Sequence, residues 1–203
     1  MIDIHAHIMP GIDDGAATME EAIQMLKIAA ENGVYAIVAT PHCNMEGLYE
    51  NYFDDDYYAL YKRLEAEAAK ENIPVQIIPG MEVYASENVL ELLQQGKIIT
   101  IGGSRYLMIE FGMQKDLALI NFLIDELLAM GYIPVIAHPE RYPYVQKTPQ
   151  LAANWLKQGC LLQLDAGSVL GSFGRQAKNT AIYMLERNMV SFVASGCEFS
   201  QSD

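Results

Sequence analysis

The sequence predicts an α/β fold with a mainly parallel sheet. Short apolar runs of about five residues alternate along the chain with longer amphipathic stretches. The apolar runs are rich in Ile, Val and Leu and do not alternate cleanly with polar residues, which is typical of strands buried on both faces. A helix-like stretch follows nearly every run, so we expect a barrel of seven strands, with an open doubly wound sheet as the alternative.

Seven runs are expected to form the strands. They are Ile2–His5, Tyr35–Thr40, Val75–Pro79, Tyr106–Glu110, Ile133–Ala137, Leu161–Leu164 and Val190–Ala194. In a barrel or in an open sheet, the carboxyl ends of parallel strands gather on one side, and active sites form there.

Five stretches between these runs have helical patterns. They span residues 18–33, 54–72, 117–131, 148–159 and 175–188. The first begins with Thr18 as N-cap and Glu21 three residues later, and it ends at Gly33. The second has acidic residues at its start and basic residues near its end, which matches the helix dipole. The third is apolar nearly all round and is expected to be well buried. The fourth begins with Thr148 as N-cap and Pro149 in its first turn, and it ends in a glycine.

The composition favours one acidic globular domain over residues 1–203. The length of 203 residues suits a single core. Hydrophobic residues make up 51% of the chain and charged residues 19%, a balance that excludes a disordered chain. The net charge of −13 should repel nucleic acid and anionic lipid, so neither is an expected partner.

The sequence also predicts a cytoplasmic location. The three cysteines are odd in number and have no CxxC spacing, so we expect reduced thiols. The first ten residues lack the basic start and apolar run of a signal peptide. No apolar stretch approaches the roughly 18 residues that span a bilayer, so direct membrane insertion is not expected.

All four histidines lie at or just beyond the ends of predicted strands. His5 and His7 are two residues apart, so in extended backbone they point to the same side, roughly 7 Å apart. Two imidazoles at that spacing can converge on one metal ion. His42 follows the second strand and His138 the fifth. Random placement would leave some histidines on helix surfaces.

Acidic residues occupy the remaining strand ends. Asp13 and Asp14 lie in a glycine-flanked turn, Glu82 follows the third strand, and Glu110 ends the fourth. A carboxylate inside the apolar run of Glu110 is costly to bury without a partner, and a metal ion would supply one. Each motif alone has an ordinary explanation, such as a turn for the two aspartates. Five consecutive strand ends offering His, Asp or Glu are harder to explain by packing.

This donor set predicts metal-dependent hydrolysis. Histidine and carboxylate ligands without a cysteine cluster favour Mn²⁺, Fe²⁺ or Zn²⁺. Some seven candidate ligands exceed the need of one ion, so a cluster of two or three ions is expected. Arg141 could hold phosphate oxygens in a forked contact, which favours phosphoester hydrolysis over amide hydrolysis. Cys43 is not expected to be a nucleophile, because no second histidine is reserved as its base.

The motifs "MIDIHAHIMPGIDDGA", "IVATPH", "IPGMEVY", "LMIEF" and "YIPVIAHPERY" resemble those of the polymerase-and-histidinol-phosphatase (PHP) superfamily. More narrowly, they resemble the manganese-dependent bacterial protein-tyrosine phosphatases of capsule and exopolysaccharide operons, the CpsB/YwqE type. The resemblance runs from Met1 to about Ser195. It implies a distorted seven-stranded barrel with a trinuclear metal site, in which Mn²⁺ is the expected ion and Fe or Zn are alternatives.

The resemblance also implies roles for individual residues. The implied metal ligands are His5, His7, Asp14, His42, Glu82, Glu110 and His138. Arg141 would hold the phosphate, and Asp14 and His42 are also expected to act in catalysis. The implied substrate is phosphotyrosine on a bacterial tyrosine kinase that controls polysaccharide export. The aromatic residues of loop 47–58, Tyr49 and Tyr52 among them, could form a rim for the tyrosine ring, or could simply pack at the start of a helix.

The chain departs from the family pattern after Ser195. The family's last strand ends "ASDAHN", in which Asp and His are metal ligands, whereas this chain reads "ASGCEF". Gly196, Cys197 and Glu198 replace the three residues after Ser195, and the following helices are missing. The abrupt switch resembles a frameshift more than gradual divergence. We expect weaker binding of at least one metal ion and an exposed apolar surface near the last strand, which could also support a homo-oligomer.

The sequence therefore predicts a metal-dependent protein-tyrosine phosphatase. Two alternatives stay open at this point. One is a catalytically weakened protein that binds phosphotyrosine tails, and the other is a phosphoesterase that acts on a small molecule.

Overall fold

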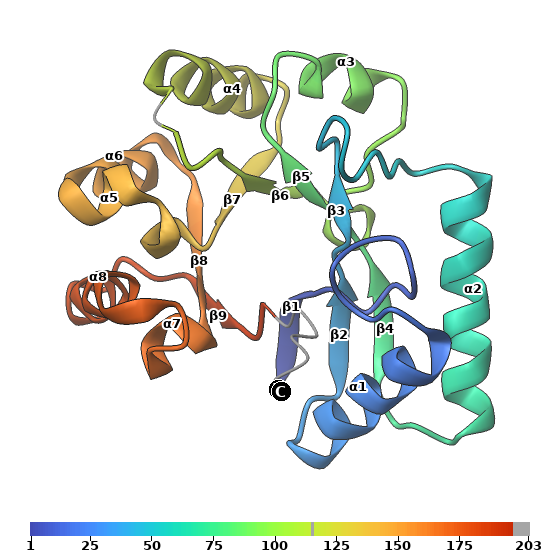
Figure 1. Cartoon of the computed structure of the whole chain (residues 1–203). Coiled ribbons are helices and arrows are strands. Elements are labelled where there is room, and N and C mark those ends of the chain that lie inside the picture. The colour runs from blue at the N-terminus through green and yellow to red at the C-terminus, as the bar shows by residue number, and fades with distance from the viewer. Residues whose placement is uncertain (115, 197–203) are drawn as a thin grey trace.

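The strands pair in parallel and form two sheets. The computed structural model describes residues 1–114 and 116–196. The strand order is β1-β2-β4 in one sheet and β3-β5-β6-β7-β8-β9 in the other. The strands are β1 Ile2–Ala6, β2 Ala36–Ala39, β3 His42–Cys43, β4 Gln76–Pro79, β5 Glu82–Tyr84, β6 Tyr106–Glu110, β7 Ile133–Ala137, β8 Leu161–Asp165 and β9 Phe192–Ala194. Figure 1 shows them around the middle of the molecule, with the helices outside. The predicted parallel α/β architecture is confirmed.

Two of the predicted strands are each followed closely by a second, short strand that belongs to the other sheet. The strand predicted over Tyr35–Thr40 is β2, and the chain resumes as β3 after Pro41. Similarly, β4 is followed by β5 after Gly80, where a side chain would meet Val38. The Glu82 amide donates to the carbonyl of Pro41 at 3.1 Å. These breaks move the chain from the first sheet to the second and place His42 opposite Glu82 in the β3–β5 pair.

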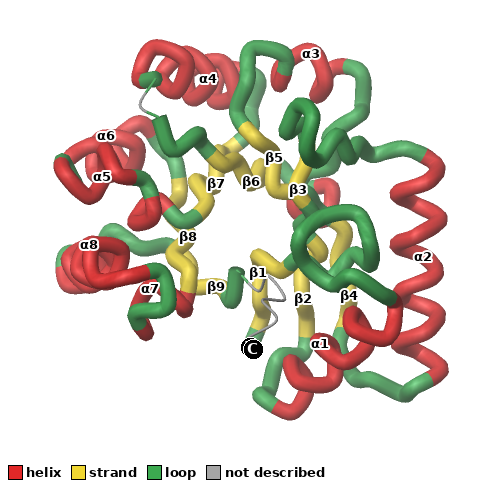
Figure 2. The backbone as a smooth tube through the Cα atoms, in the orientation of Figure 1, coloured by secondary structure: helices red, strands yellow, loops and turns green. Residues whose placement is uncertain are grey.

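The helices cover the outside of the strands (Figure 2). They are α1 Met19–Glu31, α2 Asp55–Lys70, α3 Val89–Gln94, α4 Leu117–Ala129, α5 Pro143–Lys147, α6 Gln150–Gln158, α7 Ala166–Leu170 and α8 Gly174–Glu186, with 3₁₀ turns η1 Ile101–Gly103 and η2 Pro139–Arg141. The five predicted helices are present, whereas the short ones were missed. Thr18 caps α1 by accepting from the Glu21 amide, as predicted. Thr148 is not the cap of α6, because Pro149 takes that position without a side-chain bond.

Apolar side chains fill both the space under the helices and the space between the strands. The main core lies between strands and helices and includes Trp155 and Phe111. A second, small cluster contains Met108, Val135 and Ala137, with Ile4 of β1 packed against it. This cluster joins side chains from strands of both sheets. The cluster packs between strands whose carboxyl ends carry the candidate ligands.

The two sheets approach one another but form no closed ladder within residues 1–114 and 116–196. After β9, the amide of Gly196 donates to the carbonyl of His5 at 3.0 Å, and the amide of Ser195 donates to the Asp3 carboxylate at 3.1 Å. These bonds tie the end of β9 to β1, yet the paired strands remain in two separate sheets. A closed barrel of seven strands is therefore not confirmed.

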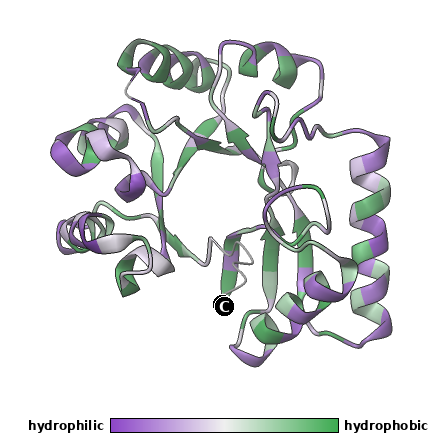
Figure 3. Cartoon of the chain, in the orientation of Figure 1, coloured by the Kyte–Doolittle hydropathy of each residue, from purple (hydrophilic) through white to green (hydrophobic). Residues whose placement is uncertain are grey.

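The helices have apolar residues on the face that packs against the core and polar residues on the outer face. Figure 3 shows polar and apolar residues alternating along α2, which buries one face through Tyr57, Tyr61 and Leu64. The helix α4 buries Leu123 and its neighbours, but the Phe122 side chain on its outer side is 51% exposed. The prediction that this helix is well buried therefore holds for one of its faces only. Among the described residues, no helix has both the length and the hydropathy needed to cross a membrane.

Candidate metal centre

Six of the seven predicted ligands meet at the carboxyl ends of the strands. His5 lies near the carboxyl end of β1. His42, Glu82 and Glu110 lie on β3, β5 and β6, respectively. His138 follows β7 directly. His7 completes the group, and all six are buried, with at most 7% of the residue exposed. Parallel pairing with adjacent registers brings these side chains together, as expected for a parallel sheet.

Glu82 is the centre of the group. Its Oε2 lies 3.3 Å from His5 Nε2, 3.3 Å from His7 Nε2 and 3.2 Å from His42 Nδ1. Its other oxygen, Oε1, lies 2.9 Å from His138 Nε2. One carboxylate therefore contacts all four imidazoles of the chain, and it does so in a buried position.

Glu110 and Asp14 lie at the edge of this group. Glu110 Oε2 is 3.6 Å from His42 Nδ1, and its Oε1 is 3.7 Å from His138 Nε2. Asp14 Oδ1 is 3.6 Å from His42 Nε2, and the Asp14 side chain is 39% exposed. Three sets of donor atoms each lie within 4.8 Å of one another: His5, His7 and Glu82; His7, Asp14 and His42; and His42, Glu82 and Glu110. The sets share members, so neighbouring ions could share ligands.

Two residues that the sequence did not identify fix the orientation of the imidazoles. Gln163 Oε1 lies 2.9 Å from His5 Nδ1, and the Gln163 amide nitrogen donates to Asp165 Oδ1 at 3.0 Å. Asp13 Oδ2 lies 2.8 Å from His7 Nδ1. Because these oxygens only accept hydrogen bonds, both Nδ1 atoms donate. In its neutral form, each imidazole therefore directs the lone pair of its Nε2 toward the centre. The signals were present: Gln163 is polar within a buried strand, and Asp13 adjoins Asp14.

The resulting geometry fits a bound cation. The two Nε2 atoms of His5 and His7 are 3.2 Å apart. Within the described part of the chain, the buried atoms His42 Nδ1, Glu82 Oε2 and Glu110 Oε2 have no hydrogen-bond partner. Unpartnered buried donor atoms that face one another are costly, and a divalent ion ligated by imidazole and carboxylate satisfies all of them.

The charges of the group also favour added positive charge. Burial by itself lowers the pKa of His138, but its hydrogen bond with Glu82 and the nearby carboxylates raise it to about 9. Burial would raise the pKa of Glu82, yet the charge of His5 and the bond with His138 hold it well below its usual range. Burial and the charge of Glu82 raise the pKa of Glu110. The carboxylates thus stabilise a cation among the imidazoles.

The loop after β1 presents Asp13 and Asp14. The amide of Ala16 donates to the carbonyl of His7 at 3.0 Å, and the amide of Gly15 donates to Asp13 Oδ1 at 3.0 Å. Asp13 Oδ2 also accepts from the amide of His42 at 3.1 Å. A Cβ atom at Gly15 would overlap the His7 carbonyl, so only glycine fits there. The loop therefore links the first two ligand-bearing strand ends.

Arg141 lies beside the group in the turn η2. His138, with φ of 32°, directs the chain into this turn. Arg141 Nη1 donates to Asp165 Oδ2 at 3.2 Å, and its side chain is 20% exposed. The positive charge of Arg141 opposes the rise in the pKa of Glu110, so the guanidinium lies within electrostatic reach of the candidate centre. A partly exposed guanidinium next to the donor atoms is suited to binding an anion.

The strand end after β9 contributes no ligand up to Gly196. This glycine has φ of 52°, and a Cβ atom there would overlap the carboxylate of Asp165. Asp165 thus occupies the space that a side chain at position 196 would take. Cys197 and Glu198, whose replacement of the family residues was noted above, lie outside the described residues.

The expected aromatic rim divides into two parts. The Tyr49 ring stacks on the His42 ring, with centroids 5.4 Å apart and planes 5° apart. Tyr57 instead packs in the core, and its hydroxyl donates to the carbonyl of Gly80 at 2.8 Å. Tyr52 lies near Lys97, whose Nζ is 5.9 Å from the ring centroid. Tyr49 is therefore the loop aromatic that contacts the centre.

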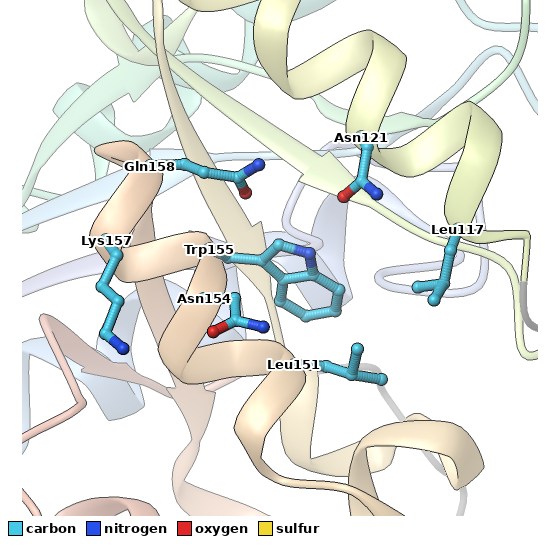
Figure 4. A pocket seen from close by; sticks show the side chains of 7 residues that line it. All are labelled: Leu117, Asn121, Leu151, Asn154, Trp155, Lys157 and Gln158. Atoms are coloured by element: carbon cyan, nitrogen blue, oxygen red, sulfur yellow. The ribbon is translucent and has the colours of Figure 1, made fainter.

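Two hollows differ in their relation to the centre. One, of about 420 Å³, shares Glu110 with the centre and is also lined by Met45, Tyr84 and Met113. Another, of about 450 Å³, lies between α4 and α6 beside Trp155 (Figure 4). Its lining contains none of the candidate ligands, so it is separate from the centre.

Comparison with known proteins relates the chain to a family and to one well-matched fold. The family described as capsular polysaccharide synthesis, CpsB/CapC, matches residues 1–202. Tyrosine-protein phosphatase YwqE of Bacillus subtilis is 36% identical over 198 residues, 96% of this chain and 76% of that protein. Tyrosine-protein phosphatase CpsB of Streptococcus agalactiae is 32% identical over 200 residues, 96% of this chain and 82% of that protein.

A solved structure matches the fold closely. It comes from work on YwqE of Bacillus subtilis and CpsB of Streptococcus pneumoniae, described as metal-dependent tyrosine phosphatases. The TM-score is 0.91 at 34% identity, over 99% of this chain and 81% of that one. The match covers all the strand ends described above.

Proposed function

The chain belongs to the CpsB/CapC family of capsular polysaccharide synthesis proteins, and we therefore propose that it is a metal-dependent protein-tyrosine phosphatase. The observation that carries this proposal is the convergence of four buried imidazoles on the Glu82 carboxylate. The relatives are named as tyrosine phosphatases, and the matched solved structure is described as metal-dependent.

The donor set would hold two or three divalent ions. The proposed ligands are His5, His7, Asp14, His42, Glu82, Glu110 and His138. Nitrogen and oxygen donors favour Mn²⁺, our first choice, with Fe²⁺ or Zn²⁺ as alternatives. When bound, such ions neutralise phosphate charge and lower the pKa of a water molecule. Gln163 and Asp13 would keep the two Nε2 atoms of His5 and His7 directed at the ions.

Arg141 would bind and orient the phosphate through its charged N–H donors. Asp14 is the most exposed of the seven proposed ligands, and its close contact with His42, at 3.6 Å, lowers its pKa. Asp14 is therefore ionised at neutral pH and would accept a proton rather than donate one. The catalytic role that we propose for Asp14 and His42 is to accept a proton at the solvent-facing edge of the ligand group.

The substrate we propose is phosphotyrosine on a tyrosine kinase of polysaccharide export. The hollow beside Glu110 adjoins the donor atoms and has Tyr84 and two methionines in its lining, which suits an aromatic ring. Tyr49 on His42 adds a second aromatic surface. The partly exposed Asp14 and the hollow beside Glu110 are the parts of the site that a peptide tail can reach.

Turnover of p-nitrophenyl phosphate and of a phosphotyrosine peptide with added Mn²⁺ tests the proposal. We expect activity with both, and loss of activity when a chelator is added. Faster turnover of sugar phosphates than of the peptide would favour a small-molecule phosphoesterase. Peptide binding without turnover would favour the weakened binding protein, which the missing side chain at Gly196 would explain.

Four further expectations stay predictions. They are closure of the strands into a distorted seven-stranded barrel, a single domain over residues 1–203, a cytoplasmic location and a homo-oligomer. The hydrogen bonds between Ser195, Gly196 and β1 support the first.

A further inference from the structure

Among the described residues, the guanidinium of Arg141 contacts the side chains of Asp165 and Phe173, which have no role in the proposed chemistry. Its Nη1 donates to Asp165 Oδ2 at 3.2 Å, and its central carbon lies 4.4 Å from the centroid of the Phe173 ring. A guanidinium within about 6 Å of an aromatic face is attracted by the ring. Phe173 is 38% exposed, so part of its ring contacts the guanidinium while part of the side chain faces solvent.

The turn between α7 and α8 places this ring. The amides of Gly171 and Ser172 both donate to the carbonyl of Gly167 at 2.8 Å. Gly171 has φ of 103°, a conformation that glycine adopts readily. The Phe173 ring then lies over Gly167, where an added Cβ would be 2.8 Å from the ring atom Cε2. The absence of a side chain at position 167 therefore allows the ring to reach Arg141.

The carboxylate of Asp165, which accepts the hydrogen bond from Arg141, is also held in place. Asp165 is fully buried at the end of β8. Its amide donates to Glu140 Oε1 at 2.9 Å, and its Oδ1 accepts from the Gln163 amide at 3.0 Å. The Gln146 amide donates to the carbonyl of Glu140 at 2.9 Å. Asp165 thus cannot follow Arg141 if the guanidinium moves.

We propose that Phe173 is a positioning residue that holds Arg141 ready for the phosphate. This inference rests on the proposed function, in which Arg141 binds that group. A guanidinium has five N–H donors in one plane, so one edge can pair with Asp165 while another binds phosphate oxygens. The ring covers a face of the guanidinium and restricts rotation of a long side chain. Phosphate then binds an arginine side chain that is already ordered, so less conformational entropy is lost on binding.

Replacing the ring tests the proposal directly. For Phe173→Leu we expect KM for a phosphotyrosine peptide and Ki for inorganic phosphate to rise about threefold to tenfold, with kcat within about twofold. Phe173→Tyr retains an aromatic face and should behave as the original protein. Phe122→Leu on α4 is the matched control, because Phe122 is another exposed phenylalanine away from Arg141.

A second variant reaches the same contact without altering either partner. In Gly167→Ala, the new methyl group should push the Phe173 ring away from Arg141 and raise KM and Ki in the same direction. Alanine is favoured over glycine within a helix, so the melting temperature should not fall. A raised KM with undiminished stability separates positioning from a general loss of folding.

The Arg141→Ala background completes the test. If Phe173 acts through Arg141, Phe173→Leu should have no further effect on Ki in that background. An undiminished effect there, or unchanged KM and Ki in both Phe173→Leu and Gly167→Ala while Arg141→Ala raises them, would overturn the inference and leave the proposed function intact. Failure of the original protein to hydrolyse phosphotyrosine would overturn both. No effect of Arg141→Ala would overturn the phosphate-binding role of Arg141 and this inference with it.

Discussion

Single hydrogen bonds decide which nitrogen of each imidazole faces the centre. His5 and His7 each have one nitrogen held by an acceptor, Gln163 Oε1 or Asp13 Oδ2. The other nitrogen is then free of its proton and can ligate a metal ion. Without these acceptors, either tautomer and several ring orientations would be open to each histidine.

Gln163→Leu should therefore weaken metal binding without removing a ligand. We expect the Kd for Mn²⁺ to rise about tenfold to a hundredfold, because such orienting partners typically contribute that much. Titration calorimetry with Mn²⁺ measures it. Gln158→Leu, on the exposed end of α6, is the control and should bind Mn²⁺ as before. Equal affinity in the two variants would contradict this orienting role.

Cys43 should be chemically silent although it adjoins His42. The thiol is fully buried, and burial raises its pKa to about 12. It stays protonated as pH rises through the neutral range and becomes a thiolate only near pH 12, so about one molecule in 10⁵ carries the thiolate at pH 7. Cys43→Ala should keep kcat within about threefold of the original value. Loss of most activity would identify a nucleophilic role after all.

At the scale of elements, two interruptions bring the ligands together. Pro41 lies between β2 and β3, and Gly80 lies between β4 and β5, where the chain passes from the first sheet to the second. The result is that His42 and Glu82 are direct neighbours in the β3–β5 pair. The loop after β1 adds Asp13 and Asp14 by folding against the carbonyl of His7. Each device depends on a residue with a special backbone requirement.

Gly15→Ala should disrupt this loop and the metal centre together. Its methyl group would overlap the His7 carbonyl, and overpacking of this kind typically costs about 1–3 kcal/mol. The shift would also separate Asp13 from His7, so Mn²⁺ affinity should fall with stability. Denaturant unfolding and Mn²⁺ titration measure both quantities.

Gly33→Ala provides the comparison. Gly33 has φ of 79° and open space around its Cβ position, so its substitution costs only backbone strain. It should lose stability but keep its Mn²⁺ affinity. Unchanged affinity in both variants would show that the loop after β1 does not position the centre.

For the whole molecule, metal binding and stability should be linked. Four imidazoles and two carboxylates are buried together in a chain whose net charge is −13. An ion that binds the folded chain and not the unfolded one stabilises it by mass action. At a free Mn²⁺ concentration a hundredfold above Kd, we expect a gain of about 2.7 kcal/mol and a rise in melting temperature of about 5–10 °C.

A chelator should reverse this rise, as differential scanning calorimetry would show. Glu82→Gln, which weakens the contact with all four imidazoles, should lose most of the response to Mn²⁺. A melting temperature that ignores Mn²⁺ in the original chain would argue against the centre as a metal site.

Much of the fold could be predicted because it depends on local patterns. Apolar runs and capping residues located the long helices and the strands, and the end of each strand is where the candidate ligands occur. The short strands β3 and β5 could not be predicted, since Thr40–Pro41 and Gly80 look like the ends of the preceding strands in the sequence. Their continuation in another sheet depends on which strand accepts the next hydrogen bonds, and that is a property of the assembled sheet.

By itself, the sequence determined the donor set of the site, since His5, His7, His42, Glu82, Glu110 and His138 are recognisable from their types and their places at strand ends. Only the tertiary structure decided which groups orient them. Gln163 is 158 residues from His5, and Phe173, in the turn between α7 and α8, contacts Arg141 of η2. A hydrogen bond or ring contact between distant segments leaves no periodic signal, because it is fixed by the packing that brings the segments together.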